Sequence, residues 1–204
     1  MTFVIASGGI DLSVGSILSL SAIFTALCMK QNIPVWLAIL VGLLSGILMG
    51  LINGALIHFT GINAFIITLG TSFLYRGLAL IVTRGTPVSK LPAAYRAFGG
   101  GDIFQVESGV YMALLVLLLS IPLLYKMRWG HYITTLGGNP VALRRCGVRT
   151  GAWRISTFAV MGFLAALAGI IISARLNSAE PNAGLNMEMD AITAVILGGT
   201  PLHG

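Results

Sequence analysis

Long apolar blocks separated by short polar stretches dominate the pattern along the chain. The blocks fall at about 12–29, 33–57, 62–83, 110–125 and 155–174, and a further one opens near Ala191. A helix needs roughly 20 residues to cross a hydrocarbon core of about 30 Å, so most of these blocks are long enough. They do not alternate apolar with polar positions, as the strands of membrane barrels do. The pattern therefore predicts an all-α fold: one domain over 1–204, a polytopic bundle of about six transmembrane spans or partial spans.

Composition agrees with a membrane protein. Hydrophobic residues make up 56% of the chain and charged residues 9%, whereas soluble domains carry about 25% charge. The formal net charge of +6 is explained by the excess of Lys and Arg in the cytoplasmic loops of membrane proteins. Because no basic stripe interleaved with aromatic residues is present, we do not expect nucleic acid as a partner.

The basic residues also predict the orientation. Half of all Lys and Arg lie in the loop 126–154, which contains no acidic residue: Lys126, Arg128, Arg144, Arg145, Arg149 and Arg154. The positive-inside rule assigns this loop to the cytoplasm. The stretches 84–109 and 175–190 are then expected on the outer side.

Glycines are placed where helices are expected to break or to pack closely. In "SGGIDLSVGS" (7–16), glycines flank Asp11, which can cap a restarted helix by accepting backbone N–H bonds, and can also face a translocation path. Both roles are compatible. Along 33–57, glycine recurs every four residues, at Gly42, Gly46, Gly50 and Gly54, which predicts a smooth ridge for close helix packing.

The basic loop contains the stretch "GGNPVALRRCGV", which predicts a short helix at about 140–146. Asn139 suits the N-cap, Pro140 the first helical position, and Gly147 the left-handed position after the last turn. The helix carries Arg144 and Arg145. It is interpreted as a docking element for a cytoplasmic partner; the alternative is an interfacial helix whose arginines meet anionic lipid.

Polar residues inside or beside the spans are candidates for the translocation path. Arg76 lies within an apolar block, where an arginine is costly; snorkelling to the outer surface, pairing with a carboxylate and substrate contact are all open. The segment 173–200 contains many amides and carboxylates. They suit hydroxyl-rich ligands, or they form a solvated loop in which Asp190 caps the next helix. The candidate set is Asp11, Ser13, Asn53, Arg76, Asn177, Glu180 and Asp190.

No enzyme chemistry is expected of this chain. The three histidines are scattered without metal spacing, Cys28 and Cys146 form no metal or disulfide pattern, and no nucleophile elbow, phosphate loop or dinucleotide fingerprint is present. We therefore predict no catalytic residue, no metal and no cofactor. An energy source must come from another chain or from an ion gradient.

Four collinear blocks carry a resemblance to a known family: "SGGIDLSVGS", "NAFIITLGTSFLYRGLALIVTRGTPV", "LGGNPVALRRCGV" and "ARLNSAEPNAGLNMEMDAITAVILGGT". Together they resemble the permease subunits of ribose-type ABC sugar importers. The resemblance covers essentially the whole chain, but helices are expected to be missing at both ends. One departure lies before Phe65, where Asn63 and Ala64 replace the family's usual proline and aromatic residue.

The resemblance implies a bacterial inner-membrane protein that works as a dimer with a second permease copy or a paralogue. It also implies a cytoplasmic ATPase subunit, which hydrolyses the ATP, and a periplasmic or extracellular sugar-binding protein. The family's coupling helix corresponds to the short loop helix, which makes these residues the candidates for ATPase docking: Asn139, Pro140, Ala142, Arg144, Arg145 and Gly147.

Two other functions stay open at this point. One is a secondary transporter, with Asp11 or Asp190 as a proton or cation site. The other is a membrane scaffold or a non-functional permease fragment. Within the importer interpretation, the sugar and the choice between homodimer and heterodimer are left undetermined by the sequence.

Overall fold

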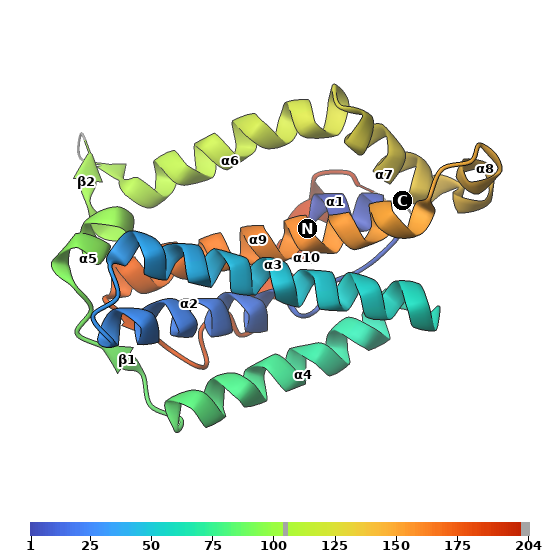
Figure 1. The fold of residues 1–204 in the computed structure, drawn as a ribbon. Helices are drawn as coiled ribbons and strands as arrows, with labels where there is room; N and C mark the ends of the chain where they lie inside the picture. The colour runs from blue at the N-terminus through green and yellow to red at the C-terminus, as the bar shows by residue number, and fades with distance from the viewer. Residues whose placement is uncertain (104–105, 201–204) are drawn as a thin grey trace.

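The structure, a computed structural model, describes residues 1–103 and 106–200. It is a helical bundle with a few two-residue strands (Figure 1). The helices are α1 Thr2–Ala6, α2 Val14–Lys30, α3 Val35–Thr60, α4 Ala64–Thr83, α5 Ala93–Gly100, α6 Ser108–Tyr125, α7 Arg128–Gly138, α8 Pro140–Arg145, α9 Thr150–Leu176 and α10 Met187–Leu197. The strands are β1 Val88–Ser89, β2 Asp102–Ile103, β3 Val106–Glu107 and β4 Ser178–Ala179.

Among the described residues, four helices are long and apolar enough to cross a membrane, namely α3, α4, α6 and α9. Helix α2 is apolar but has 17 residues, and α10 has 11. These two are the partial spans among the six blocks that the sequence marks. The prediction of an all-α transmembrane bundle is confirmed, and so is its location in a membrane.

Helix α9 is the centre of the bundle, and α3 packs along its length (Figure 1). The glycine ridge of α3 makes this packing possible. Gly46, Gly50 and Gly54 lie directly against the α9 backbone or its small side chains, whereas Gly42 faces Thr25 of α2. At Gly162 of α9, an added Cβ would overlap the carbonyl oxygen of Gly46. Only residues without a side chain allow this approach.

The two ends of the bundle are built differently. At one end, α5 lies beside α9, and β1 pairs with β4 in antiparallel register, Val88 opposite Ala179 (Figure 1). Tyr95 anchors α5: its hydroxyl lies 3.0 Å from the carbonyl oxygen of Ile170 and 2.6 Å from the hydroxyl of Ser173. Burial raises the pKa of Tyr95 to about 12, so the hydroxyl stays protonated.

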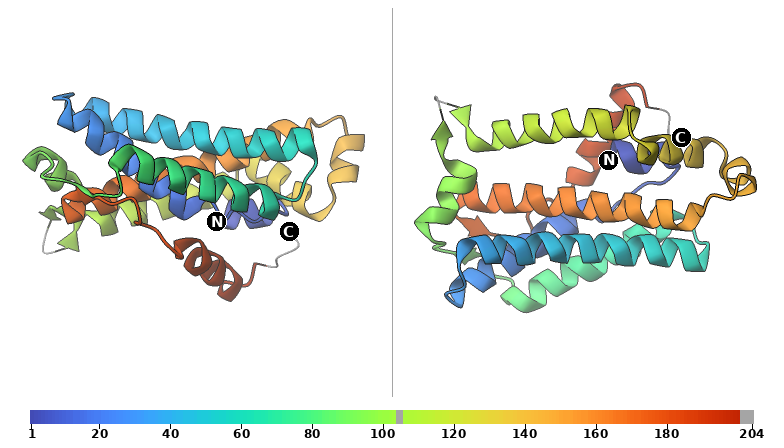
Figure 2. Two further views of the ribbon diagram at one scale, coloured as in Figure 1. Left: turned by 90° about the horizontal axis from the view of Figure 1, so that it is seen from below. Right: turned by 45° about the horizontal axis from the view of Figure 1, so that its top comes forward.

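The other end carries the α3–α4 turn and the helices α7 and α8 (Figure 1). The sequence predicted only one short helix in the basic loop; the structure adds α7, an 11-residue helix before it. Helix α6 arches away from α9, and α10 stands off from the other helices (Figures 1 and 2). This end, which α8 marks, is called the α8 end below, and the opposite one the α5 end.

Candidate functional site

The polar centre of the bundle is the break between α1 and α2. Gly8 has φ +76°, a left-handed conformation that suits glycine, and α2 resumes only at Val14. The break was predicted from the glycines around Asp11. The structure extends it over residues 7–13, so α2 begins two residues later than the apolar block suggests.

Asp11 is fully buried at this break. Its Oδ1 accepts bonds from the backbone N–H of Ser13 at 2.9 Å and from the hydroxyl of Ser13 at 2.6 Å. Ser13 is the N-cap of α2, so Asp11 satisfies an N–H just before the helix rather than one in its first turn. Its other oxygen, Oδ2, is buried and has no hydrogen-bond partner among the described residues.

Hydrogen-bonded side chains link the break to α3 and α4. The amide of Asn53 donates to the hydroxyl of Ser13 at 2.7 Å, and the Tyr75 hydroxyl lies 3.1 Å from the amide oxygen of Asn53. From α4, Thr68 accepts a bond from the backbone N–H of Leu12 at 3.0 Å. Three predicted residues, Asp11, Ser13 and Asn53, thus meet in one buried network.

Arg76 directly follows Tyr75 in α4 and holds a different segment. Its guanidinium donates to the carbonyl oxygens of Pro181 at 2.6 Å and Ala183 at 2.7 Å, and lies 3.2 Å from the hydroxyl of Ser19. The charge binds backbone carbonyls inside the protein and also interacts electrostatically with the carboxylate of Glu188. It fixes the segment after β4 against α2 and α4.

The segment 180–188 therefore turns back into the bundle. At Gly15 of α2, an added Cβ would lie 2.7 Å from the carboxylate of Glu188 and would overlap the carbonyl oxygen of Gly184. Glycine at 15 and the left-handed Gly184 (φ +73°) let the two backbones meet.

The remaining outer candidates lie apart from the network. Asn177 is the left-handed C-cap of α9, and Glu180 and Asp190 are exposed. The alternative in which Asp190 caps the last helix is wrong, because the N-cap of α10 is Asn186 and Asp190 lies in its first turn. These residues are not brought together with Asp11.

At the α8 end, the side chain of Asn139 accepts the N–H of Ala142 at 2.9 Å, Pro140 opens α8, and the Gly147 N–H returns to the carbonyl of Arg144 at 3.0 Å. Gly147 has φ +78°. The other docking candidates, Arg144 and Arg145, are exposed in the last turn.

Sequence reasoning missed three residues that bond the network or Arg76: Ser19, Thr68 and Tyr75. The signal for Thr68 and Tyr75 was present, since both are polar-tipped residues inside an apolar block. Their partners on other helices could not be read from spacing. Within residues 1–103 and 106–200, no group of three or more His, Cys, Asp or Glu side chains could hold a metal ion.

Comparison with known proteins gives the family. Over residues 1–204, the chain matches the family described as the permease component of the branched-chain amino acid transport system. The chain belongs to this family. The resemblance to permeases is thus confirmed.

Individual relatives in this permease family are sugar permeases by name. The chain is 39% identical to the ribose import permease protein RbsC of Haemophilus influenzae and 40% identical to that of Bacillus subtilis, over 100% of this chain and 64% of each relative. It is 37% identical to the D-allose transport system permease protein AlsC of Escherichia coli, over 99% of this chain and 62% of that protein. The chain thus spans slightly less than two thirds of the length of these relatives. No solved structure matches it.

Proposed function

We propose that this chain is the membrane-spanning part of an ATP-driven importer permease that carries a monosaccharide, such as ribose or a related sugar, across the bacterial inner membrane. The observation that carries the proposal is the whole-length similarity to ribose and allose permeases. Because both sugars occur among the relatives, the sugar itself is not fixed.

The chain supplies the path and its partners supply the energy and the delivery. A separate cytoplasmic ATPase subunit hydrolyses ATP, a sugar-binding protein presents the sugar from outside, and a second permease copy or a paralogue completes the pore. Helix α8 is the proposed coupling element. Its two capped ends make it a rigid unit, and Leu143, buried at 6% exposure, anchors it to the protein.

Coupling then has a structural route. Movement of α8 acts on the start of α9, and α9 packs against both α2 and α3 along the bundle. The polar network of Asp11, Ser13 and Asn53 lies between α2, α3 and α4. A shift of α9 would alter the packing around this network, where the proposed path runs.

The test uses the full-length permease in proteoliposomes with its ATPase subunit and binding protein. Uptake of labelled ribose should require ATP inside the vesicles and survive collapse of the ion gradients. Uptake that stops with the gradient and ignores ATP would instead establish the ion-coupled alternative. Absence of uptake for every monosaccharide, with an intact assembly, would contradict the proposed function.

The docking assignment predicts that Arg144→Glu with Arg145→Glu abolishes uptake, because two positive charges on an exposed helix become negative where an acceptor surface is expected. Insertion into the membrane should be unchanged. The matched control is Arg128→Glu, an exposed arginine of α7 in the same basic region, which should transport normally. Normal uptake by the double variant would exclude α8 as the coupling element.

A further inference from the structure

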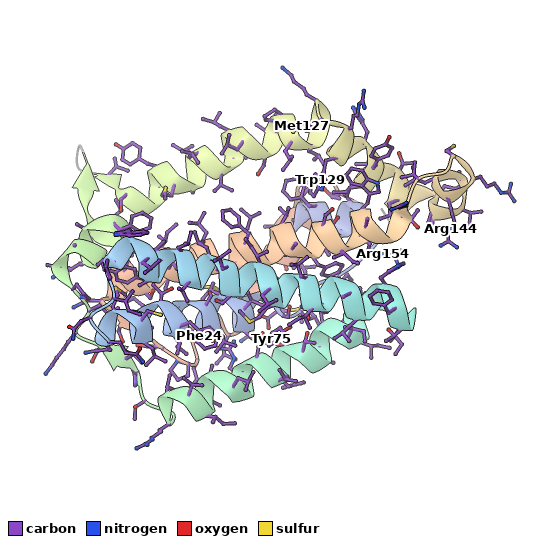
Figure 3. All side chains as sticks on the ribbon, in the orientation of Figure 1. Phe24, Tyr75, Met127, Trp129, Arg144 and Arg154 are labelled. Carbon is purple, nitrogen blue, oxygen red and sulfur yellow. The ribbon has the colours of Figure 1, made fainter. Side chains whose placement is uncertain are left out.

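A small cavity lies at the α8 end, between the end of α3 and the starts of α8 and α9. Its volume is about 200 Å³, and His58, Arg144, Thr150, Gly151 and Arg154 are among its lining residues. Figure 3 labels Arg144 and Arg154, which come from α8 and from the first turns of α9. Three basic side chains from three helices thus converge on one cavity.

The positive charge at this cavity is not compensated by the chain. Arg154 is half-buried, and its guanidinium has no hydrogen bond or ion pair within the part of the chain that the structure describes. The sequence from 108 to 179 contains no Asp or Glu at all. An arginine that is removed from water without a partner is costly. The free guanidinium of Arg154 is therefore available to a negatively charged group of another molecule.

The walls of the cavity favour an anion. The imidazole of His58 lies against the backbone of Gly151, where an added Cβ would overlap the ring. Helix α9 begins beside it with 27 residues, without a side-chain cap and without an acidic residue in its first turn. Its partial positive charge therefore adds to that of the two arginines.

The position of the cavity identifies the source of the anion. It opens where α3 ends and α9 begins, two helices that are long and apolar enough to span the membrane. The positive-inside rule assigns this end to the cytoplasmic leaflet, where anionic lipids gather. Phe59, next to His58, is 81% exposed, as expected of a side chain at the edge of the apolar membrane core. A lipid with its headgroup in the cavity would place its acyl chains beside Phe59, whereas a soluble anion makes no use of this apolar surface.

We propose that this cavity binds the phosphate of an anionic phospholipid of the cytoplasmic leaflet. Arg154 and Arg144 hold the phosphate oxygens from two sides, since a guanidinium matches phosphate geometry. A water molecule takes about 30 Å³ of liquid volume, so a cavity of about 200 Å³ has room for a phosphate group.

The bound lipid would link α8 to the bundle. Arg144 belongs to α8 and Arg154 to α9, so one phosphate bridges the proposed coupling helix and the central helix. The two neighbouring arginines of α8 then differ: Arg144 also lines the cavity, and Arg145 serves docking alone. The inference goes beyond the proposed transport function, and its test does not require transport.

The test measures binding of short-chain phosphatidylglycerol to the purified full-length permease by calorimetry in detergent. Arg154→Gln should weaken binding at least about tenfold, the loss expected for a charge-assisted phosphate contact. The matched control Arg128→Gln, an exposed arginine outside the cavity, should bind within about twofold of the unmodified protein. Equal affinity in the Arg154→Gln variant would overturn the proposal.

Two further ligands identify what is recognised. Phosphatidylcholine with the same chains should bind at least about tenfold more weakly than phosphatidylglycerol, because it carries no net charge to match the arginines. Equal binding of the two lipids would overturn the headgroup assignment. Inorganic phosphate should not displace phosphatidylglycerol at equal concentration; if it does, the site binds a soluble phosphate rather than a lipid.

A measurement on the unmodified protein covers the case in which Arg154→Gln does not insert. Raising the salt concentration to about 0.5 M should weaken phosphatidylglycerol binding several-fold, because salt screens the contact between the phosphate and the arginines. The apolar contacts of the acyl chains are not weakened by salt. Salt-independent binding would show that the chains alone are recognised and would overturn the proposal.

Discussion

In the middle of the bundle, the side chain of Asn53 is fully buried and both ends of its amide bind groups of the same chain. At the α8 end, the guanidinium of Arg154 has no partner among the residues that the structure describes. The first region is closed on itself, so its polar groups fix how the helices pack. The second is open, so its charges are available to other molecules. A polar residue in a membrane protein is therefore interpreted by its partners rather than by its type.

The same contrast explains two arginines of the spans, Arg76 inside α4 and Arg154 near the start of α9. Arg76 has the backbone carbonyls of Pro181 and Ala183 as acceptors and serves to hold a segment in place. Arg154 has the same chemistry and is left without an acceptor in the described chain. The contacts of Arg76 fix the packing of the segment after β4, and Arg154 is the residue proposed to bind an outside ligand.

The largest loss of stability is expected from a substitution at the tightest contact between α3 and α9. Gly162→Ala places a Cβ against the carbonyl oxygen of Gly46, so α3 and α9 must move apart, at a cost of about 1–3 kcal/mol. Thermal unfolding, monitored by size-exclusion chromatography after heating, should show a lower midpoint temperature. In the control Gly70→Ala, the added Cβ meets nothing within 4 Å, and stability should hold or rise slightly, because alanine favours helices. Equal midpoints for the two variants would contradict the close packing of α3 on α9.

A comparable loss of stability is expected when the polar network loses its central member. Asn53→Ala leaves the Ser13 and Tyr75 hydroxyls without their amide partner in a buried site, which costs about 1–3 kcal/mol. The control Ser45→Ala removes a hydroxyl that bonds only within its own helix, to the carbonyl of Gly42, and should change stability by less than about 0.5 kcal/mol. If Asn53→Ala melts like Ser45→Ala, the network does not hold α2, α3 and α4 together.

The smallest expected effect concerns the charge of Asp11. Asp11→Asn keeps the oxygen that accepts both bonds from Ser13, and asparagine caps as well as aspartate. Stability should change by less than about 1 kcal/mol, and uptake should persist. A severe loss of uptake by a well-folded Asp11→Asn protein would show that the charge itself acts in transport, as the ion-coupled alternative requires.

Much of the fold could be predicted, because the length of an apolar block and the capping residues at its ends are local features of the sequence. The blocks gave the helices α2, α3, α4, α6 and α9, and Asn139, Pro140 and Gly147 gave the short helix α8. The return of segment 180–188 against Gly15 could not be predicted, since it depends on contacts between residues far apart in the chain.

The candidate site was predicted in part for the same reason. Asp11, Ser13 and Asn53 were selected as polar residues in apolar surroundings, and they do meet. Arg76 was selected on the same grounds, yet it binds a loop. Spacing along one helix does not say which residue of another helix lies opposite, so Tyr75 and the cavity around Arg154 became visible only in three dimensions.

The most direct test of the central claim uses Cys146, the exposed cysteine that ends α8. In a full-length permease with Cys146 as its only cysteine, a membrane-impermeant maleimide should label inside-out vesicles and leave right-side-out vesicles unlabelled. Addition of the ATPase subunit should then strongly reduce the labelling. Labelling from the outer side, or labelling that the ATPase leaves unchanged, would contradict the account of α8 as the cytoplasmic docking helix of an importer permease.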